Sequence, residues 1–228
     1  MILVIDNFDS FTYNLVQFAG AINPNMKIKL YQDDIPSSLK LGNSIAIDSE
    51  AMGLNHLRDR LCLIQMSNGN GTCHLVKINN VSKKPKNLKK ILKNKKILKI
   101  FHYARFDVGI LNYTYDINIK NIYCTKIASK LVRTFTDKHG YQDLCFELLN
   151  KKILKTEQTS DWGSEKLTSN QQKYAATDVL YLHQLKYKLD EMLLRENRIK
   201  ISKACFDFIE HRVNLDLLGW SDLDIFKH

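Results

Sequence analysis

Hydrophobic positions follow two different spacings along the chain, and the change comes near its middle. In the first part, short runs of β-favouring residues predict strands at residues 27–31, 44–48, 61–67, 72–78 and 97–101. Helical spacing of apolar residues predicts helices at residues 87–93, 105–113, 125–133, 141–150, 168–190 and 195–210, with one more short strand at 119–124. Strands first, then alternation, then helices predict an α/β fold, a mixed sheet flanked by helices.

Two local signals fix where some of these elements begin and end. Asn68-Gly69-Asn70-Gly71 lies between two predicted strands and is typical of a hairpin turn, because Asn and Gly tolerate positive φ. The three strands within residues 44–78 are therefore expected to be antiparallel. Thr168 and Gln171 have the spacing of a capping box, so a helix is expected to start there.

Composition limits the classes of protein to which the chain can belong. Its 228 residues, 44% of them hydrophobic, are enough for one globular domain with a sizeable core. The net charge of +10 favours a polyanionic partner, although a lysine-rich composition alone would give the same value. The five cysteines are scattered and form no Cys-x-x-Cys pair, which argues against a disulfide framework or a zinc knuckle.

The chain shows no targeting or membrane signal. The apolar start, residues 1–5, is interrupted by Asp6 before a signal-peptide core could form. No run approaches the roughly 20 apolar residues that a membrane span needs. We therefore expect a cytoplasmic protein without membrane contact, and the sequence indicates no obligate protein partner.

Asp48 and Glu50 are the first candidates for chemistry, at the end of the strand predicted from residue 44. Side chains two apart on a strand share a face, so both carboxylates point the same way if the backbone stays extended through Ser49. Two anions held that close repel each other unless a cation lies between them. The alternative is a surface strand end with two solvated acids.

Asp107, Tyr174 and Asp178 are the other candidates. Asp107 lies near the start of a predicted helix, where an acid suits the helix dipole and needs no further role. Tyr174 and Asp178 are four apart on one helical face, beside the buried stripe. The alternative for Tyr174 is a half-buried ring that only packs.

The four carboxylates together form a donor set for hard divalent cations such as Mg²⁺ and Mn²⁺, which prefer oxygen ligands. Two such ions about 4 Å apart can hold both the attacking and the leaving oxygen of a phosphodiester. No His/Cys cluster has the spacing of a zinc site.

The same residues carry a resemblance to a known family. Three segments, residues 45–50, 102–107 and 174–178, resemble the three motifs of the DEDD exonucleases in the form with Tyr four before Asp. Residues from about 27 to 228 are similar to the ribonuclease D branch of that family, which has a ribonuclease H-like fold. Tyr103 departs from the pattern, since many members have Asn there.

The resemblance implies a role for each candidate residue. Asp48 would bridge two metal ions, Mg²⁺ or Mn²⁺, while Glu50 and Asp178 would complete the site of the ion that holds the attacking water. Asp107 would support the second ion. Tyr174 would orient the attacking water and help to deprotonate it.

The resemblance further implies a 3′→5′ exoribonuclease that releases 5′-nucleotides, acting in tRNA 3′ processing or RNA turnover on single-stranded 3′ ends. A DNA exonuclease of repair or proofreading is the alternative, because the choice depends on 2′-OH contacts that the sequence does not reveal. An inactive nucleic-acid-binding module is a third hypothesis.

The nine lysines of residues 83–99 could contact phosphates, but Leu88, Ile91 and Leu92 favour a helix with one anchored and one solvated face.

The first 24 residues predict a strand and a helix of another origin. Residues 1–17 resemble the opening of class I glutamine amidotransferases, such as the small subunit of anthranilate synthase. That family needs a nucleophilic Cys on a Gly-flanked elbow, and Cys73 lies instead in a predicted hairpin strand. We therefore expect residues 1–26 to be an amidotransferase-like fragment without that activity, not an independent domain, and residues 27–228 to form the exonuclease domain.

Overall fold

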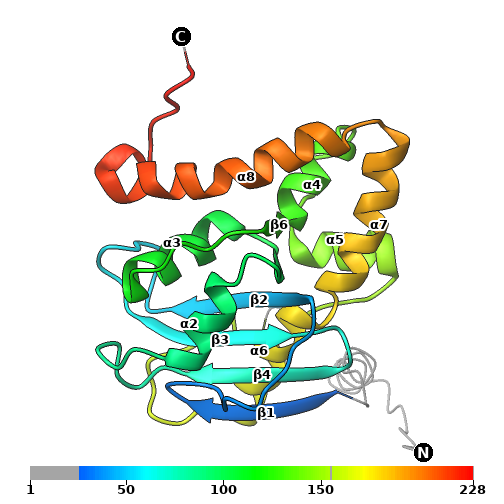
Figure 1. Ribbon diagram of the computed structural model, residues 1–228. Helices are drawn as coiled ribbons and strands as arrows, with labels where there is room; N and C mark the ends of the chain where they lie inside the picture. The colour runs from blue at the N-terminus through cyan, green and yellow to red at the C-terminus, as the bar shows by residue number, and fades with distance from the viewer. Residues whose placement is uncertain (1–25, 155, 228) are drawn as a thin grey trace, which may run out of the picture.

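A mixed sheet forms the centre of the computed structural model, which describes residues 26–154 and 156–227 (Figure 1). Within these residues the sheet has six strands in the order β1-β4-β3-β2-β5-β6. The strands are β1 Lys27–Gln32, β2 Ser44–Ala51, β3 Leu61–Ser67, β4 Thr72–Lys77, β5 Leu98–Phe101 and β6 Ile122–Cys124. The expected mixed α/β sheet of the ribonuclease H-like type is confirmed. The strand and helix predicted within residues 1–24 lie outside the described residues.

The strand directions agree with the turn signals. β2, β3 and β4 are antiparallel neighbours, as expected, and Gly69 and Gly71 in the β3–β4 turn have φ values of 81° and 82°. The two edges are parallel: β5 runs parallel to β2 and β6 to β5, while β1 runs parallel to β4. Every residue of β3 is buried, because helices cover both faces of the sheet.

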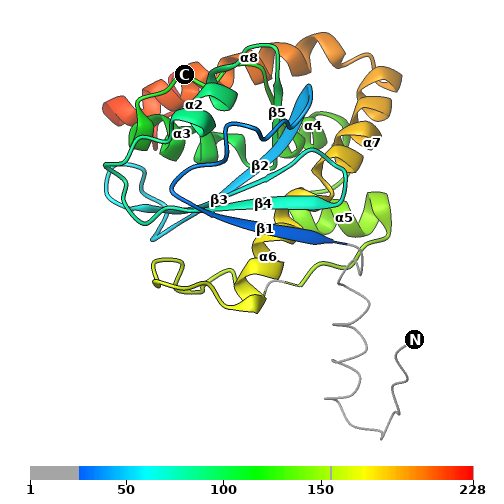
Figure 2. The same cartoon turned by 60° about the horizontal axis from the view of Figure 1, so that its bottom comes forward.

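The helices lie on both sides of this sheet, with α2 and α3 on one face and α6 on the other (Figure 2). Their bounds are α2 Lys86–Lys93, α3 Ala104–Tyr115, α4 Thr125–Val132, α5 Tyr141–Leu149, α6 Ser169–Leu180, α7 Leu182–Arg195, α8 Ile199–Leu215 and the short π-helix η1 Asp216–Trp220. Helix α8 packs on α3, α4 and β6. Among the described helices, none has the length and apolar character needed to cross a membrane.

The lysine-rich segment lies away from the face that α6 covers. Helix α2 is on the opposite side of the sheet, anchored by buried Leu88 and Leu92 (Figure 2). Lys89 donates a hydrogen bond from Nζ to the carbonyl of Tyr115 at 2.7 Å, so part of the segment serves the fold itself. The structure therefore favours the interpretation of an anchored helix with a solvated face.

Strand β2 continues beyond the predicted residue 48 to Ala51, while its neighbour β5 pairs with it only as far as Ala46. The later part of β2 therefore has no pairing with β5. Ser49, on the opposite face from Asp48, donates a 2.7 Å hydrogen bond to Asp107 of α3. The extended backbone through Ser49 places Asp48 and Glu50 on one face.

One predicted element is wrong: residues 168–190 do not form a single helix. The helix starts at the expected capping box, where Thr168 and Gln171 exchange hydrogen bonds, but breaks at Tyr181 between α6 and α7. The hydroxyl of Tyr141 donates to the carbonyl of Thr177 at 2.6 Å and accepts from the amide of Tyr181 at 3.4 Å. A continuous helix would pair those two groups with each other, so the inserted hydroxyl breaks it.

We expect Tyr141→Phe to lower the free energy of unfolding by about 1–3 kcal/mol, because it removes a buried hydroxyl that satisfies two backbone groups. Tyr115→Phe is the matched control, since the Tyr115 hydroxyl is buried without a hydrogen-bond partner among the described residues. Urea denaturation of both variants measures the difference. Equal losses would contradict the role given to the Tyr141 hydroxyl.

Candidate active site

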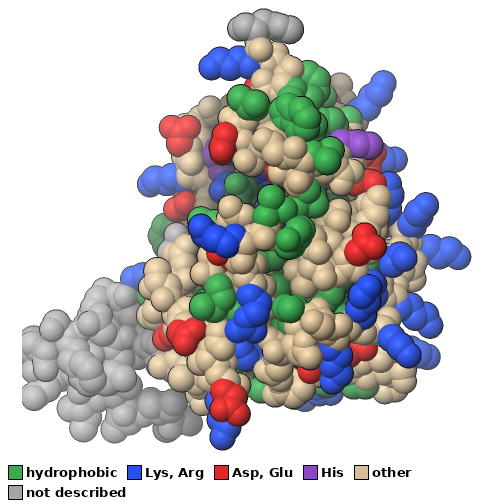
Figure 3. Space-filling view, turned by 90° about the vertical axis from the view of Figure 1, so that its left-hand side faces the viewer, with side chains coloured by type: hydrophobic (Ala, Val, Ile, Leu, Met, Phe, Trp, Pro, Cys, Tyr) green, Lys and Arg blue, Asp and Glu red, His purple; other side chains and the backbone are tan. Residues whose placement is uncertain are grey.

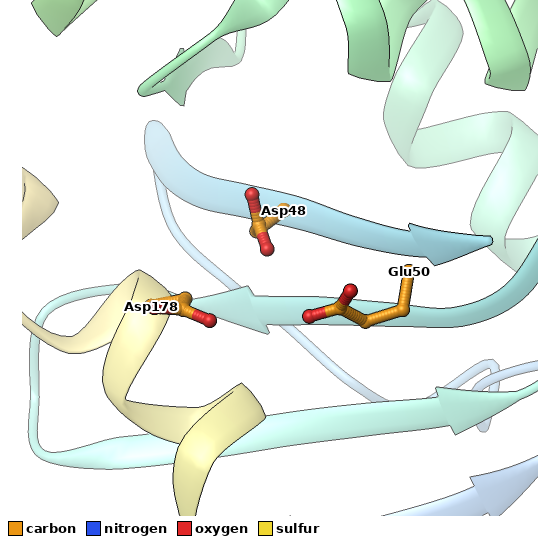
Figure 4. Close-up of side chains that lie close together, drawn as sticks. All are labelled: Asp48, Glu50 and Asp178. Atoms are coloured by element: carbon orange, nitrogen blue, oxygen red, sulfur yellow. The ribbon is translucent and has the colours of Figure 1, made fainter. Parts of the chain in front are cut away.

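Three carboxylates converge between the sheet and helix α6. Asp48 and Glu50 come from β2 and Asp178 from α6, and their side chains point toward one another (Figure 4). One oxygen from each lies within 4.8 Å of the other two. The convergence follows from the fold, because α6 packs on β2, β3 and β4 on the face that carries Asp48 and Glu50.

The electrostatics of this group favour a bound cation. Burial raises the pKa of Asp48 to about 7. Burial, together with the neighbouring carboxylates of Asp48 and Asp178, raises the pKa of Glu50 to about 10. Three carboxylate oxygens in one half-buried place suit a hard divalent cation such as Mg²⁺ or Mn²⁺, which would relieve their repulsion. The donor set of the described residues therefore fits the metal ions that the sequence predicts.

Asp107 reaches the same cleft from the other side of β2. It is 2% exposed, and burial and the charge of Asp48 hold its pKa well above the usual range. Its oxygen Oδ1 accepts the hydrogen bond from Ser49, which fixes its direction. It does not belong to the group of three converging oxygens. Sequence reasoning did not single out Ser49, although its place between the two acids of β2 was a usable signal.

Tyr174 precedes Asp178 by one helical turn on α6 and lines the cleft with it. Its ring packs against Trp162, with 6.1 Å between the ring centroids. Burial, followed by the charges of Asp178 and Glu50, raises the pKa of the phenol, so the hydroxyl keeps its proton at neutral pH.

The cleft has a volume of about 660 Å³, and all five predicted site residues line it. Among the described residues that line it, Lys126 is the one Lys or Arg side chain. Its ammonium lies 4.5 Å from the centroid of the exposed Tyr103 ring, within cation–π distance. The cleft therefore combines an acidic floor with a cation and an aromatic ring on its wall. Sequence reasoning had not singled out Lys126.

The sequence from residue 31 to 194 matches the model of a 3′-5′ exonuclease family. The chain therefore belongs to the 3′-5′ exonuclease family, and the predicted relation is confirmed. The structure of Brucella melitensis NrnC with bound Mg²⁺ is 46% identical, with a TM-score of 0.83, and the match covers 89% of this chain and 100% of that one. Another structure shows the same protein bound to pGG, at 47% identity over 89% of this chain and 99% of that one, with a TM-score of 0.84.

Curated relatives include the ribonuclease D of Gluconacetobacter diazotrophicus, 30% identical over 68% of this chain and 39% of the relative. The DNA polymerase I of Aquifex aeolicus is 32% identical over 68% of this chain and 25% of that protein. The chain thus spans well under half the length of these curated relatives.

The comparisons give no support to the amidotransferase resemblance of residues 1–17, and the family match begins only at residue 31. Cys73 lies in β4 as predicted, where burial raises the pKa of its thiol. A buried, protonated thiol in a strand lacks the features of an activated nucleophile.

In EDTA, we expect the free energy of unfolding to fall by a few kcal/mol as pH rises from about 4 to about 7. The pKa of Asp48 is about 7 in the folded state, which is higher than in the unfolded chain. The protonated carboxyl therefore contributes its full stabilisation at a pH below the unfolded-state pKa, and this stabilisation is lost as the pH rises through the folded-state pKa. Thermal unfolding in EDTA from pH 4 to 8 measures this fall.

Asp48→Asn should flatten that pH dependence and unfold at a higher temperature than the wild type at pH 8 in EDTA. Mg²⁺ should stabilise the wild type far more than this variant. An unchanged pH profile in Asp48→Asn would show that repulsion at this residue does not limit stability.

Proposed function

We propose that this chain is a metal-dependent 3′→5′ exoribonuclease, which hydrolyses phosphodiester bonds from the 3′ end of RNA and releases 5′-nucleotides. The observation that carries the proposal is the convergence of Asp48, Glu50 and Asp178 within 4.8 Å in a chain of the 3′-5′ exonuclease family. We assign the exonuclease domain to residues 27–228.

Each site residue then has a role. Asp48, Glu50 and Asp178 would hold two divalent ions together with Asp107, and Asp48 would be the ligand that both ions share. When bound, Mg²⁺ or Mn²⁺ would supply the positive charge that lowers the pKa of water and neutralises charge developing on the phosphate. Tyr174 keeps its own proton, so its hydroxyl orients the attacking water without acting as the base, and Ser49 keeps the carboxylate of Asp107 turned into the cleft.

The substrate that we propose is a short single-stranded RNA 3′ end. The binding of pGG by the NrnC of Brucella melitensis and the likeness to ribonuclease D both support it. A cleft of about 660 Å³ has the size of a small-molecule site, with room for the terminal nucleotides and not for a duplex. The net charge of +10 suits a polyanion, and basic side chains gather along one edge of the surface (Figure 3).

We further propose that the protein acts in the cytoplasm. All five cysteines are free thiols, and four of them are buried, which fits a reducing compartment.

A DNA exonuclease is the second candidate, and the likeness to the DNA polymerase I of Aquifex aeolicus supports it. Parallel digestion of RNA and DNA oligonucleotides of one sequence separates the candidates. Faster turnover of RNA supports the exoribonuclease, and faster turnover of DNA supports the alternative.

We expect Asp178→Asn to lower kcat on a 3′-extended RNA by more than about 100-fold. Loss of a residue that only hydrogen-bonds a metal ligand typically costs 10- to 100-fold in activity, and loss of the ligand itself should cost more. The assay follows shortening of a 5′-labelled RNA in Mg²⁺, with EDTA as the blank. Asp190→Asn, on α7 and away from the cleft, is the matched control and should retain activity. Equal activity in Asp178→Asn and wild type would refute the metal assignment.

Lys126 should contact a substrate phosphate, since it supplies the cation on the cleft wall. We expect Lys126→Ala to raise KM about tenfold with little change in kcat, and to reduce the dependence of KM on salt. Lys130→Ala is the control, because Lys130 is exposed one turn later on α4 and does not line the cleft. Equal KM values for the two variants would remove Lys126 from the substrate site.

A further inference from the structure

Three consecutive backbone carbonyls, those of Asp161, Trp162 and Gly163, are each held by a side chain from a different part of the fold, and Trp162 among them lines the cleft. We call this arrangement the carbonyl clasp. Its hydrogen bonds run from Gln171 Nε2 to Asp161 O at 3.1 Å, from Lys77 Nζ to Trp162 O at 2.8 Å, and from Arg60 Nη2 to Gly163 O at 3.4 Å. The segment around Trp162 has no regular secondary structure, so these contacts take the place of a helix or strand in fixing it.

Lys77 is the central donor of the clasp and is 2% exposed. It lies on β4 in the cross-strand row Glu50–Leu63–Lys77, so it shares the sheet face of the site. Burial lowers the pKa of its ammonium group. A buried cation is costly unless it is hydrogen-bonded, which makes its bond to the carbonyl of Trp162 a strong constraint on the segment.

Trp162 is the residue that this constraint places. It is 3% exposed, lines the cleft, and packs on the ring of Tyr174 at 6.1 Å between centroids. Its indole Nε1 is buried without a hydrogen-bond partner among the described residues, so the ring is held by packing and by its own backbone. The next residue, Gly163, is closely packed, because a Cβ there would lie 2.6 Å from the Sδ atom of Met52.

From this geometry we propose that Lys77 is a positioning residue for the reaction. It holds the carbonyl of Trp162, the indole ring then fixes the ring of Tyr174, and the hydroxyl of Tyr174 is thereby aimed at the attacking water. The inference rests on the proposed function, because it needs Tyr174 to act in catalysis.

Lys99 provides a matched control. It is also a fully buried strand lysine, and its Nζ donates to the carbonyls of Asn94 at 2.7 Å and Ile97 at 2.9 Å. These carbonyls lie in the α2–β5 turn, and neither lines the cleft. Lys99→Met therefore removes a buried ammonium of the same kind without touching the carbonyl clasp.

The test compares Lys77→Met and Lys99→Met in the full chain carrying Trp220→Phe, which leaves Trp162 as the one tryptophan of the two in the sequence. Lys77→Met should shift the fluorescence emission of Trp162 to longer wavelength and lower kcat at least tenfold, with KM changed less than twofold. Lys99→Met should lower the melting temperature by a similar amount and leave both emission and kcat unchanged.

Unchanged emission and kcat in Lys77→Met, or equal kcat losses in both variants, would overturn the proposal. If Lys77→Met does not fold, Gln171→Glu takes its place, because Glu keeps the capping-box acceptor and loses the donor to Asp161. It should shift emission and lower kcat in the same direction, and no change would overturn the proposal. A wild-type protein that leaves RNA intact would instead refute the proposed function. The fluorescence emission of Trp162 needs no substrate, so it would still test whether Lys77 positions Trp162.

Discussion

Repulsion among carboxylates that the fold forces together is the constraint on which the rest of the structure depends. The chain could relieve this repulsion by keeping Asp48, Glu50 and Asp178 solvated, yet it holds their oxygens within 4.8 Å of one another in a partly buried cleft. The raised pKa values of Asp48 and Glu50 express the free energy stored there. Such a cluster persists only because packing of the surrounding sheet and helices contributes more free energy of folding than the repulsion among the carboxylates costs.

The sheet and the helix that hold the carboxylates together are stabilised by ordinary hydrophobic packing. Strand β3 is buried along its whole length next to β2, and α6 lies across the sheet with Ala175, Ala176 and Val179 buried against it. Hydrogen bonds then set directions within the frame. Ser49 turns Asp107 inward, and the carbonyl clasp keeps the loop wall in place beside Tyr174. The strands and helices thus fix where the site residues lie, and the buried hydrogen bonds fix the directions of their side chains.

Local patterns in the sequence could predict most of this frame, because strand alternation, the hairpin glycines and the Thr168 capping box act over a few residues. The acids of β2 were predictable as a pair for the same reason. What could not be read from sequence depends on contacts between distant segments. The Ser49–Asp107 bond joins residues 58 apart, and the Lys77–Trp162 bond joins residues 85 apart. The break at Tyr181 was missed because the hydroxyl that causes it comes from Tyr141, 40 residues earlier.

That inserted hydroxyl also ties the direction of one helix to the position of another. The sequence of residues 168–190 favours one straight helix, and the hydroxyl that interrupts it belongs to Tyr141 of α5. The angle between α6 and α7 therefore depends on where α5 packs. A change that displaces α5 would remove the partner of both backbone groups and let α6 run straight on into α7.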